Sequence, residues 1–206
     1  MAFLAAYKKI HHINLELWSP AKARSGKTDM QIIKERMTES GVPEAIIDAK
    51  MNECFDCMIE HYKTHAHRDS CVILSVVQEI LDRCKKEHIL LGLVTGNVEQ
   101  IAYEKLKKIG IDDYFAFGAF GNESALRAQL VQMAIQRARQ RGLRVQDKVF
   151  LVGDTPRDID AAKGKATSIG VATGMFTAFE LREAGADHVF ENLCKTEELL
   201  ALFRSA

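Results

Sequence analysis

The chain has 206 residues, with 28 Lys or Arg residues balanced by 28 Asp or Glu residues, so its formal net charge is zero. That balance argues against the basic composition typical of nucleic-acid-binding proteins and gives no bulk attraction to an anionic membrane. No apolar run approaches the roughly 20 residues of a membrane-spanning helix, and the first residues lack the basic-then-apolar order of a signal peptide. We therefore expect a cytoplasmic protein that binds neither nucleic acid nor membranes. Its length allows one sizeable domain, or a core with a smaller partner.

The first third of the sequence predicts helices and no strand. Apolar residues recur at intervals of three and four over residues 2–18. Thr28 and Gln31 have the spacing of a capping box, which predicts a helix that runs to about Ser40 and ends at Gly41-Val42-Pro43. A longer helix is expected from about residue 44 to residue 65. The pair Cys54 and Cys57 lies on this helix, and without a second Cys or His pair we interpret it as packing rather than as a metal or redox site.

The remaining sequence alternates between strands and helices. Strands are expected at residues 89–94, 114–120, 149–153, 167–171 and 188–190, and helices at about 71–88, 97–110, 124–141, 177–184 and from 196 onward. This order predicts right-handed βαβ units, and hence an α/β fold whose parallel sheet has helices on both faces. We place the boundary near residues 66–70, with a helical module at residues 1–68 and an α/β core at residues 69–206.

The stretch from Val149 to Asp160 carries the strongest chemical signal. Four apolar residues read as a buried strand, Gly153 opens a turn, and Asp154 and Asp158 follow it. Ligands of open α/β sheets bind just outside the carboxyl ends of the strands, and carboxylates that converge there suit Mg²⁺, which takes oxygen ligands. The alternative is that Asp154 caps a helix while Asp158 and Asp160 are solvated.

Two further predicted strand ends carry polar groups. The Thr95 hydroxyl, with the amides of Gly96 and Asn97 at a helix start, would bind an anion; alternatively, Asn97 is an N-cap and Thr95 an ordinary strand residue. Arg127 begins the helix after the weakest strand, where it would neutralise a phosphate or be solvated. A hydroxyl, a cation and metal-binding carboxylates at one sheet edge suit phosphoryl transfer, in which catalysis consists largely of positioning and charge stabilisation.

These segments resemble motifs of the haloacid dehalogenase-like hydrolases, in particular the phosphoglycolate phosphatase-like branch. Leu93-Val94-Thr95-Gly96-Asn97 is similar to the second family motif and Gly153-Asp154-Thr155-Pro156-Arg157-Asp158 to the fourth, while Arg127 resembles the third-motif cation. The resemblance implies that Thr95 and the Gly96–Asn97 amides bind a phosphoryl group, that Asp154 binds Mg²⁺, and that Asp158 is a ligand or supports one. Ser25-Gly26-Lys27-Thr28-Asp29 is similar to a segment of the helical cap, where Lys27 would contact the substrate or remain on the surface.

One departure from the family pattern is large. The first family motif, Asp-x-Asp-Gly-Thr, supplies the nucleophile and the general acid/base from a central strand, and nothing similar occurs in these 206 residues. Three explanations compete: a start that omits the authentic N-terminus, a short variant that has lost the nucleophile, or a rearrangement of residues 2–8 into the strand position. We expect two central strands to lack a partner and this chain to have no phosphatase turnover.

The resemblance implies Mg²⁺-dependent hydrolysis of a small phosphorylated metabolite, of which phosphoglycolate is the best single candidate. A catalytically dead phosphate-binding or interaction protein is one alternative. Carbon–halogen hydrolysis is the other, although it normally needs no Mg²⁺ and the acidic fourth motif argues against it. The sequence does not indicate an oligomeric state.

Overall fold

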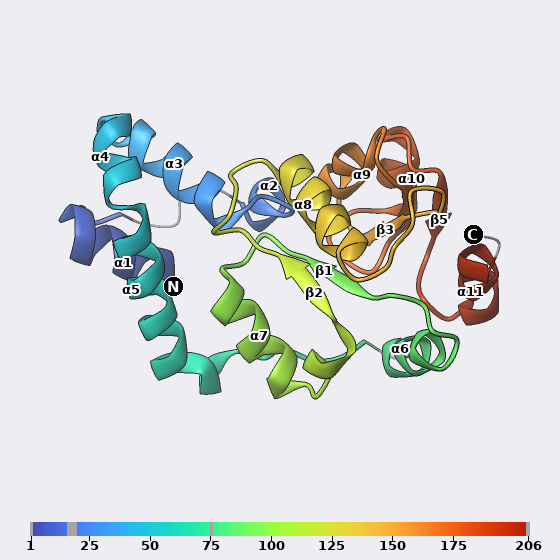
Figure 1. Ribbon diagram of the computed structural model, residues 1–206. Coiled ribbons are helices and arrows are strands. Elements are labelled where there is room, and N and C mark those ends of the chain that lie inside the picture. The colour runs from blue at the N-terminus through green and yellow to red at the C-terminus, as the bar shows by residue number, and fades with distance from the viewer. Residues whose placement is uncertain (1, 16–19, 75, 205–206) are drawn as a thin grey trace.

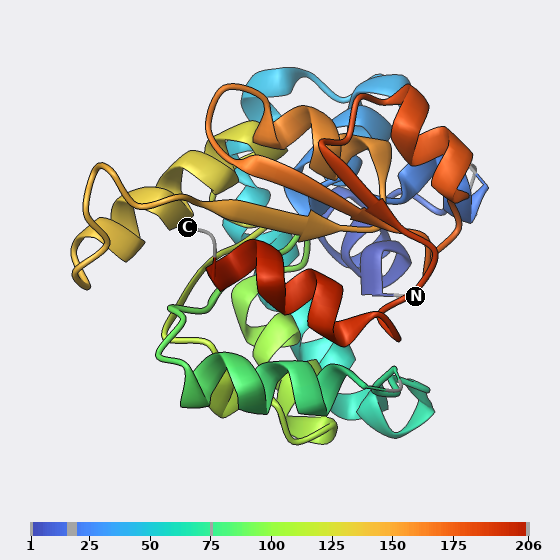
Figure 2. The same ribbon diagram turned by 90° about the vertical axis from the view of Figure 1, so that its right-hand side faces the viewer.

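The computed structural model describes residues 2–15, 20–74 and 76–204, and Figures 1 and 2 show it from two sides. Its elements in chain order are α1 Ala2–His11, α2 Ala21–Arg24, α3 Asp29–Glu39, α4 Glu44–Ala49, α5 Met51–His65, η1 Ala66–Arg68, α6 Val77–Lys86, β1 Gly92–Val94, α7 Glu99–Lys108, η2 Asp112–Tyr114, β2 Phe117–Ala119, α8 Arg127–Arg139, β3 Phe150–Gly153, α9 Pro156–Ala162, β4 Thr167–Val171, α10 Ala178–Glu183, β5 His188–Phe190 and α11 Thr196–Arg204.

The described part of the first third is helical, as the sequence predicts. Helix α3 begins at the N-cap Thr28, whose hydroxyl accepts a hydrogen bond from the Gln31 N–H. Helices α1, α3, α4 and α5 bury a common core that includes Ile33, Met37 and Met58, and they lie together at one end of the molecule (Figure 1). Among the described residues, no helix is long and apolar enough to cross a membrane.

Three of the predicted helices differ from the structure by more than three residues at one end or are interrupted. The first ends at His11, because His12 adopts the left-handed conformation at φ 58° that terminates helices; residues 16–18 of the prediction lie outside the described residues. The helix expected over residues 44–65 is interrupted at Lys50, whose Nζ donates to the Ile10 carbonyl at 3.0 Å. The helix expected from residue 71 begins only at Val77, after another left-handed residue, Val76.

All strand pairs are parallel, but they form two separate sheets. Strand β1 pairs with β2, and β3, β4 and β5 pair in that order. No strand among the described residues joins β1 to β3. Residues 2–11 form helix α1, so the explanation that residues 2–8 rearrange into a strand is wrong.

Helices cover both faces of the three-stranded sheet (Figure 2). Helices α9 and α10 pack on one face, while α6 and α11 meet Ile169 and Val171 of β4 on the other in a shared apolar core. Helix α8 packs on β1 and β2, where Leu130 and Ala134 contact Phe117 and Ala119. The predicted α/β architecture is therefore confirmed.

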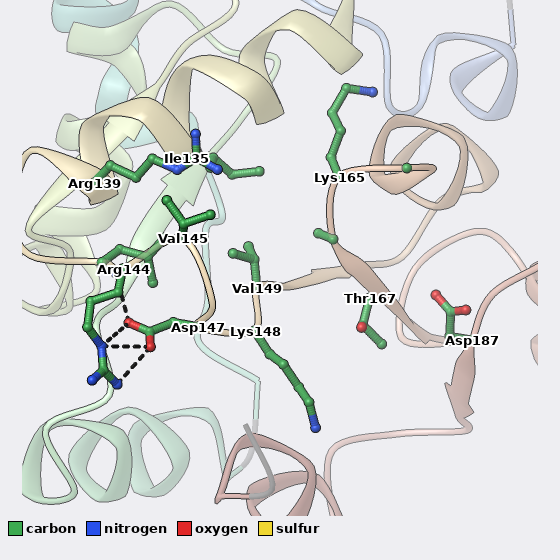
Figure 3. Close-up of a pocket in the computed structure, with 13 residues that line it drawn as sticks. Ile135, Arg139, Arg144, Val145, Asp147, Lys148, Val149, Lys165, Thr167 and Asp187 are labelled. Carbon is green, nitrogen blue, oxygen red and sulfur yellow. Dashed lines mark hydrogen bonds and ion pairs between the residues drawn. The ribbon is translucent and has the colours of Figure 1, made fainter.

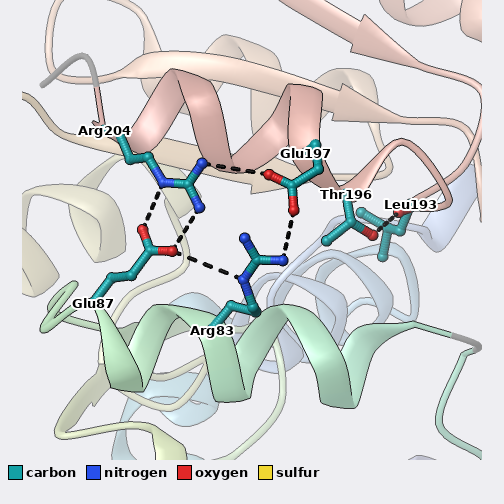
Figure 4. Close-up of polar contacts among 6 residues, drawn as sticks. All are labelled: Arg83, Glu87, Leu193, Thr196, Glu197 and Arg204. Carbon is teal, nitrogen blue, oxygen red and sulfur yellow. Dashed lines mark hydrogen bonds and ion pairs between the residues drawn. The ribbon is translucent and has the colours of Figure 1, made fainter.

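Four charged side chains join α6 to α11 (Figure 4). Arg204 donates to both oxygens of Glu87 at 2.8 and 2.6 Å, and Arg83 donates to Glu197 at 2.6 Å. The Arg204 hydrogen bond lowers the pKa of Glu87. Because these groups are exposed to solvent, the network fixes how the two helices are aligned more than it adds to stability.

Neighbouring isoleucines on α4 provide a test of the helical core. Ile47 is 1% exposed and Ile46 is 45% exposed. Ile47→Ala should lower the free energy of unfolding by about 2–5 kcal/mol, because it leaves a cavity in the core. Ile46→Ala, the matched control, should change it by roughly 0.5 kcal/mol or less. Equal losses in urea titrations of the two variants would contradict this packing.

Candidate active site

All seven candidate site residues line one cavity of about 300 Å³ at the carboxyl ends of β1 and β3. They are Lys27, Thr95, Gly96, Asn97, Arg127, Asp154 and Asp158, and they share the cavity wall with Phe3, Arg24, Ser25, Gly26, Asp29, Ile32 and Thr155. Residues more than 100 positions apart thus meet at the sheet edge where open α/β sheets bind ligands. The arrangement brings together every residue that the motifs indicated; the role of each stays a prediction.

Residues 25–29, which we term the crossing segment, lie over these strand ends and hold the helical region on the core. The Asp29 N–H donates to the Gly96 carbonyl at 2.7 Å, and the Asp29 carboxylate accepts from the Val98 N–H at 2.8 Å. The buried Thr28 hydroxyl donates to the Ala125 carbonyl at 3.1 Å. The segment is therefore bonded both to the turn after β1 and to the loop before α8.

Glycines allow this close approach. A Cβ on Gly96 would lie 2.2 Å from the Lys27 carbonyl oxygen, and one on Gly121 would lie 1.7 Å from the Gly96 carbonyl oxygen. Gly26 has a φ of +77°, and a Cβ there would also lie 2.5 Å from the Thr155 hydroxyl. A side chain at any of the three positions would separate the crossing segment from the strand ends.

The turn after β1 folds on its own polar groups. The Thr95 hydroxyl accepts the Asn97 N–H at 3.2 Å, while the Asn97 side-chain oxygen accepts from Lys105 at 2.9 Å. The alternative interpretation of Asn97 as an N-cap is wrong, because Val98 occupies that position and the Glu99 N–H is bonded by Asn122 instead. Among the described residues, no hydrogen bond uses the Gly96 N–H, which leaves that donor at the cavity wall.

Arg127 and Asp158 form a nearly buried ion pair. The Arg127 Nε donates to Asp158 Oδ1 at 2.6 Å, with the two side chains 15% and 3% exposed. Asp158 Oδ2 accepts from the N–H and the hydroxyl of Thr155, which makes Asp158 the third residue of a capping box at the start of α9. Asp158 is therefore not solvated. Both of its oxygens are occupied by protein donors, and its charge orients Arg127.

Asp154 is a partly buried carboxylate without a bonded cation among the described residues. Burial raises its pKa and the neighbouring Asp158 charge raises it further, while a hydrogen bond from its own backbone N–H and the Arg127 charge lower it. A Cβ on Gly174 would lie 1.9 Å from Asp154 Oδ2, so the loop after β4 packs directly against this carboxylate. An oxygen donor at a cavity wall with excess negative charge suits a hard cation. No cluster of three or more His, Cys, Asp or Glu residues with metal-binding geometry occurs among the described residues.

Asp29 is a site residue that the sequence interpretation treated only as part of a helix start. It is 4% exposed, and burial raises its pKa to about 6, although the Val98 N–H, Lys105 and Asn97 each lower it. An acidic residue directly after an N-cap normally faces solvent near the helix dipole. The sequence therefore carried no signal that this one faces inward.

A larger cavity, of about 420 Å³, lies at the opposite ends of β3 and β4 (Figure 3). Its cations do not converge: Arg144 is bonded to Asp147, and the Lys148 and Lys165 side chains extend away from the cavity in opposite directions. Lys165 donates to the carbonyls of Ala161 and Lys163. This cavity lacks a carboxylate, hydroxyl and cation aimed at one point, so we assign the chemistry to the smaller cavity.

A family of known proteins matches most of this chain. The family model described as haloacid dehalogenase-like hydrolase matches residues 11–172. The chain belongs to the haloacid dehalogenase-like hydrolase family. This hydrolase is 25% identical over 158 residues to a "phosphorylated carbohydrates phosphatase" of Thermotoga maritima, an alignment that covers 71% of this chain and 69% of that one.

Solved structures show that the family fold extends over nearly the whole chain. A hydrolase from Pseudomonas syringae has a TM-score of 0.70 at 22% identity, covering 97% of this chain and 89% of the other. A protein titled a predicted phosphoglycolate phosphatase, from Haemophilus somnus, has a TM-score of 0.65 at 17% identity over 97% and 88% of the two chains. At these identities the likeness concerns the fold of this hydrolase.

The buried Asp29 should give this hydrolase a distinct pH dependence of stability. Between about pH 4 and pH 6 the folded chain retains a proton on Asp29 that the unfolded chain, with a pKa near 3.8, has lost. The Asp29 contribution to the free energy of unfolding therefore falls as the pH rises through this window. Asp29→Asn should remove up to roughly 3 kcal/mol of that decline, measured by urea unfolding at pH 4, 5, 6 and 7. A variant whose pH profile runs parallel to that of the parent would contradict the assignment.

Glu180→Gln is a control in which the expected change of stability with pH has the opposite sign. The Lys22 hydrogen bond lowers the pKa of Glu180 to about 2, so its contribution to stability is complete above its usual pKa of 4.5 and is lost as the pH falls toward 2. The amide at position 180 should therefore lower stability at pH 7 and have less effect at low pH.

Proposed function

We propose that this cavity binds the phosphoryl group of a small phosphomonoester together with Mg²⁺, as in a phosphatase of this family. The convergence of Thr95, Arg127 and Asp154 on one 300 Å³ cavity carries the proposal. A hydroxyl, a cation and a carboxylate are what phosphoryl transfer requires for positioning and for charge stabilisation. The name of the Thermotoga maritima relative supports a phosphorylated metabolite as substrate.

Different residues of the cavity would bind different parts of the phosphoryl group. The Thr95 hydroxyl and the Gly96 N–H would donate to phosphoryl oxygens, with the Asn97 amide holding the Thr95 hydroxyl in place. Arg127 donates to Asp158 and, at 3.4 and 3.5 Å, to the Gly26 and Val94 carbonyls. It would offset phosphate charge through its positive charge and through the N–H groups that these bonds leave available. Asp158 would act through Arg127, because its own oxygens are already bonded.

The donor set fits Mg²⁺ with one carboxylate. Mg²⁺ usually keeps several waters and binds through one or two carboxylates together with substrate phosphate oxygens. Asp154 lines the cavity, has no cation bonded to it among the described residues and carries the repulsive charge that a cation would relieve. When bound, Mg²⁺ would neutralise phosphate charge; Asp154 would hold it and Asp158 would contribute indirectly.

Turnover is a separate matter from binding. The printed sequence holds no Asp-x-Asp-Gly-Thr motif, and no other carboxylate of the cavity takes its place: Asp29 accepts the Val98 N–H, and Asp158 is bonded to Arg127. We therefore propose that this 206-residue chain binds phosphate and Mg²⁺ without hydrolysing phosphomonoesters. Release of phosphate from p-nitrophenyl phosphate that depends on Mg²⁺ and is lost in Asp154→Asn would contradict this.

Isothermal titration calorimetry tests the metal assignment. Asp154→Asn should weaken Mg²⁺ binding at least about tenfold, since a direct ligand matters at least as much as the groups that support one. Asp160→Asn is the matched control, because this exposed carboxylate lies on the same helix as Asp158 and pairs only with Lys163 among the described residues. Its Mg²⁺ affinity should equal that of the parent.

The same titration with inorganic phosphate tests the anion site. Thr95→Val removes the hydroxyl while keeping the size of the side chain, and it should weaken phosphate binding roughly tenfold through one lost hydrogen bond to a charged group. Equal phosphate affinity in the parent and in Thr95→Val would show that the Thr95 hydroxyl does not bind phosphate. An absence of phosphate binding by the parent, with and without Mg²⁺, would overturn the proposed function.

A further inference from the structure

Arg24 is the cation of the cavity whose guanidinium lacks an ion-pair partner among the described residues. It ends helix α2, directly before the crossing segment, and lines the same cavity as Thr95 and Arg127. Its Nε is buried and makes no hydrogen bond. A buried N–H of a charged group without an acceptor costs free energy and requires an explanation.

The other two cations of the cavity are already neutralised. Arg127 donates to Asp158 at 2.6 Å, and the Lys27 Nζ donates to Glu35 at 2.5 Å. Lys27, the cap residue that the sequence indicated for substrate contact, therefore directs its charge at a neighbouring helix residue. In the part of the chain that the structure describes, Arg24 therefore carries the positive charge on the helical side of the cavity that has no carboxylate partner.

Nearby groups of the protein do not replace an anionic ligand for Arg24. Arg24 acts electrostatically on Tyr7 and lowers the pKa of its phenol, but burial raises that pKa by more, so the phenol stays neutral and provides no anion. Among the described residues, neither carboxylate on the core side of the cavity forms an ion pair with Arg24. Asp158 pairs with Arg127, and Asp154, on the opposite wall, has no bonded cation.

We infer that Arg24 binds a second anionic group of the substrate, so that the site selects phosphomonoesters with a carboxylate or a second phosphoryl group over those of neutral polyols. A guanidinium presents paired donors that match either oxyanion. The cavity, at about 300 Å³, is at the lower end of ligand-pocket sizes, which favours a molecule of a few carbon atoms. This inference rests on the proposed function, because it concerns the far end of the same ligand.

Three small ligands separate the possibilities by calorimetry in Mg²⁺ buffer. Phosphoglycolate carries a carboxylate, ethyl phosphate replaces that group with a methyl, and ethylene glycol bisphosphate carries a second phosphoryl group. The parent should bind at least one of the two doubly functional ligands about 10 to 100 times more tightly than ethyl phosphate, the range expected for hydrogen bonds to charged groups. Whichever of the two binds more tightly identifies the second anion.

Two variants of helix α2 show whether Arg24 is responsible. Arg24→Gln should reduce the affinity ratio between the preferred ligand and ethyl phosphate to about one, and Arg24→Lys should restore part of it. Lys22→Gln removes the same charge from the same helix, but Lys22 is exposed, pairs with Glu180 and does not line the cavity. The parent ratio should persist in this control.

The outcomes distinguish the two levels of the proposal. If ethyl phosphate and inorganic phosphate do not bind the parent at all, the proposed function fails. If they bind as tightly as the doubly functional ligands, or if Arg24→Gln keeps the parent ratio, the role of Arg24 is wrong while the phosphate site stands. A loss of the ratio in Lys22→Gln as well would assign it to overall charge and would equally overturn the role of Arg24.

Discussion

The hydrogen bonds between the crossing segment and the turn after β1 are the interaction on which the site depends. Asp29 bonds Gly96 and Val98 from its backbone and its side chain, and Gly121 approaches the same turn closely enough that no side chain would fit. Through these contacts the crossing segment lines the cavity, holds the turn after β1 in place and attaches the helical region to the core. The same few hydrogen bonds therefore stabilise the fold and set the geometry of the ligand site. An anion bound at Gly96 would contact the crossing segment as well as the core.

Charge compensation then decides which residues are available to a ligand. From the sequence, Asp154 and Asp158 are expected to hold a metal, Arg127 to offset phosphate charge, and Lys27 to contact the substrate from the cap or to remain on the surface. The structure separates them: Arg127 and Asp158 neutralise each other, Lys27 is neutralised by Glu35, and Asp154 is left as a carboxylate without a bonded cation among the described residues. A cavity that keeps one uncompensated carboxylate and one uncompensated guanidinium, Arg24, is suited to hold a cation and an anion at the same time.

Local chemistry explains which parts could be predicted from the sequence. The strands and the cap at Thr28 were predicted because apolar runs and side-chain capping are properties of neighbouring residues. The expectation that the strand before Asp154 is fully buried is wrong, since β3 leaves Val152 45% exposed. The break at Lys50, the N-cap at Val98 and the burial of Asp29 depend on groups 23 to 69 positions away or on packing, and no local pattern reports them. The same limit separates Arg24 from Lys27: both are cations beside Gly26, and only the tertiary position of Glu35 shows which one is already paired.

Arg127 belongs to the proposed anion site and also contributes to how the two sheets are positioned relative to each other. Strands β1 and β3 share no ladder among the described residues, so their relative position depends on other contacts. Helix α8 packs on β1, β2 and α9, and Arg127 at its first position reaches the Val94 carbonyl at the end of β1 and Asp158 after β3. A phosphate bound by Arg127 would therefore contact the side chain that links the ends of β1 and β3. Binding at this point would stabilise the arrangement of both strand ends, since it adds an anion between the Gly96 N–H after β1 and Arg127, which is itself bonded to Asp158 after β3.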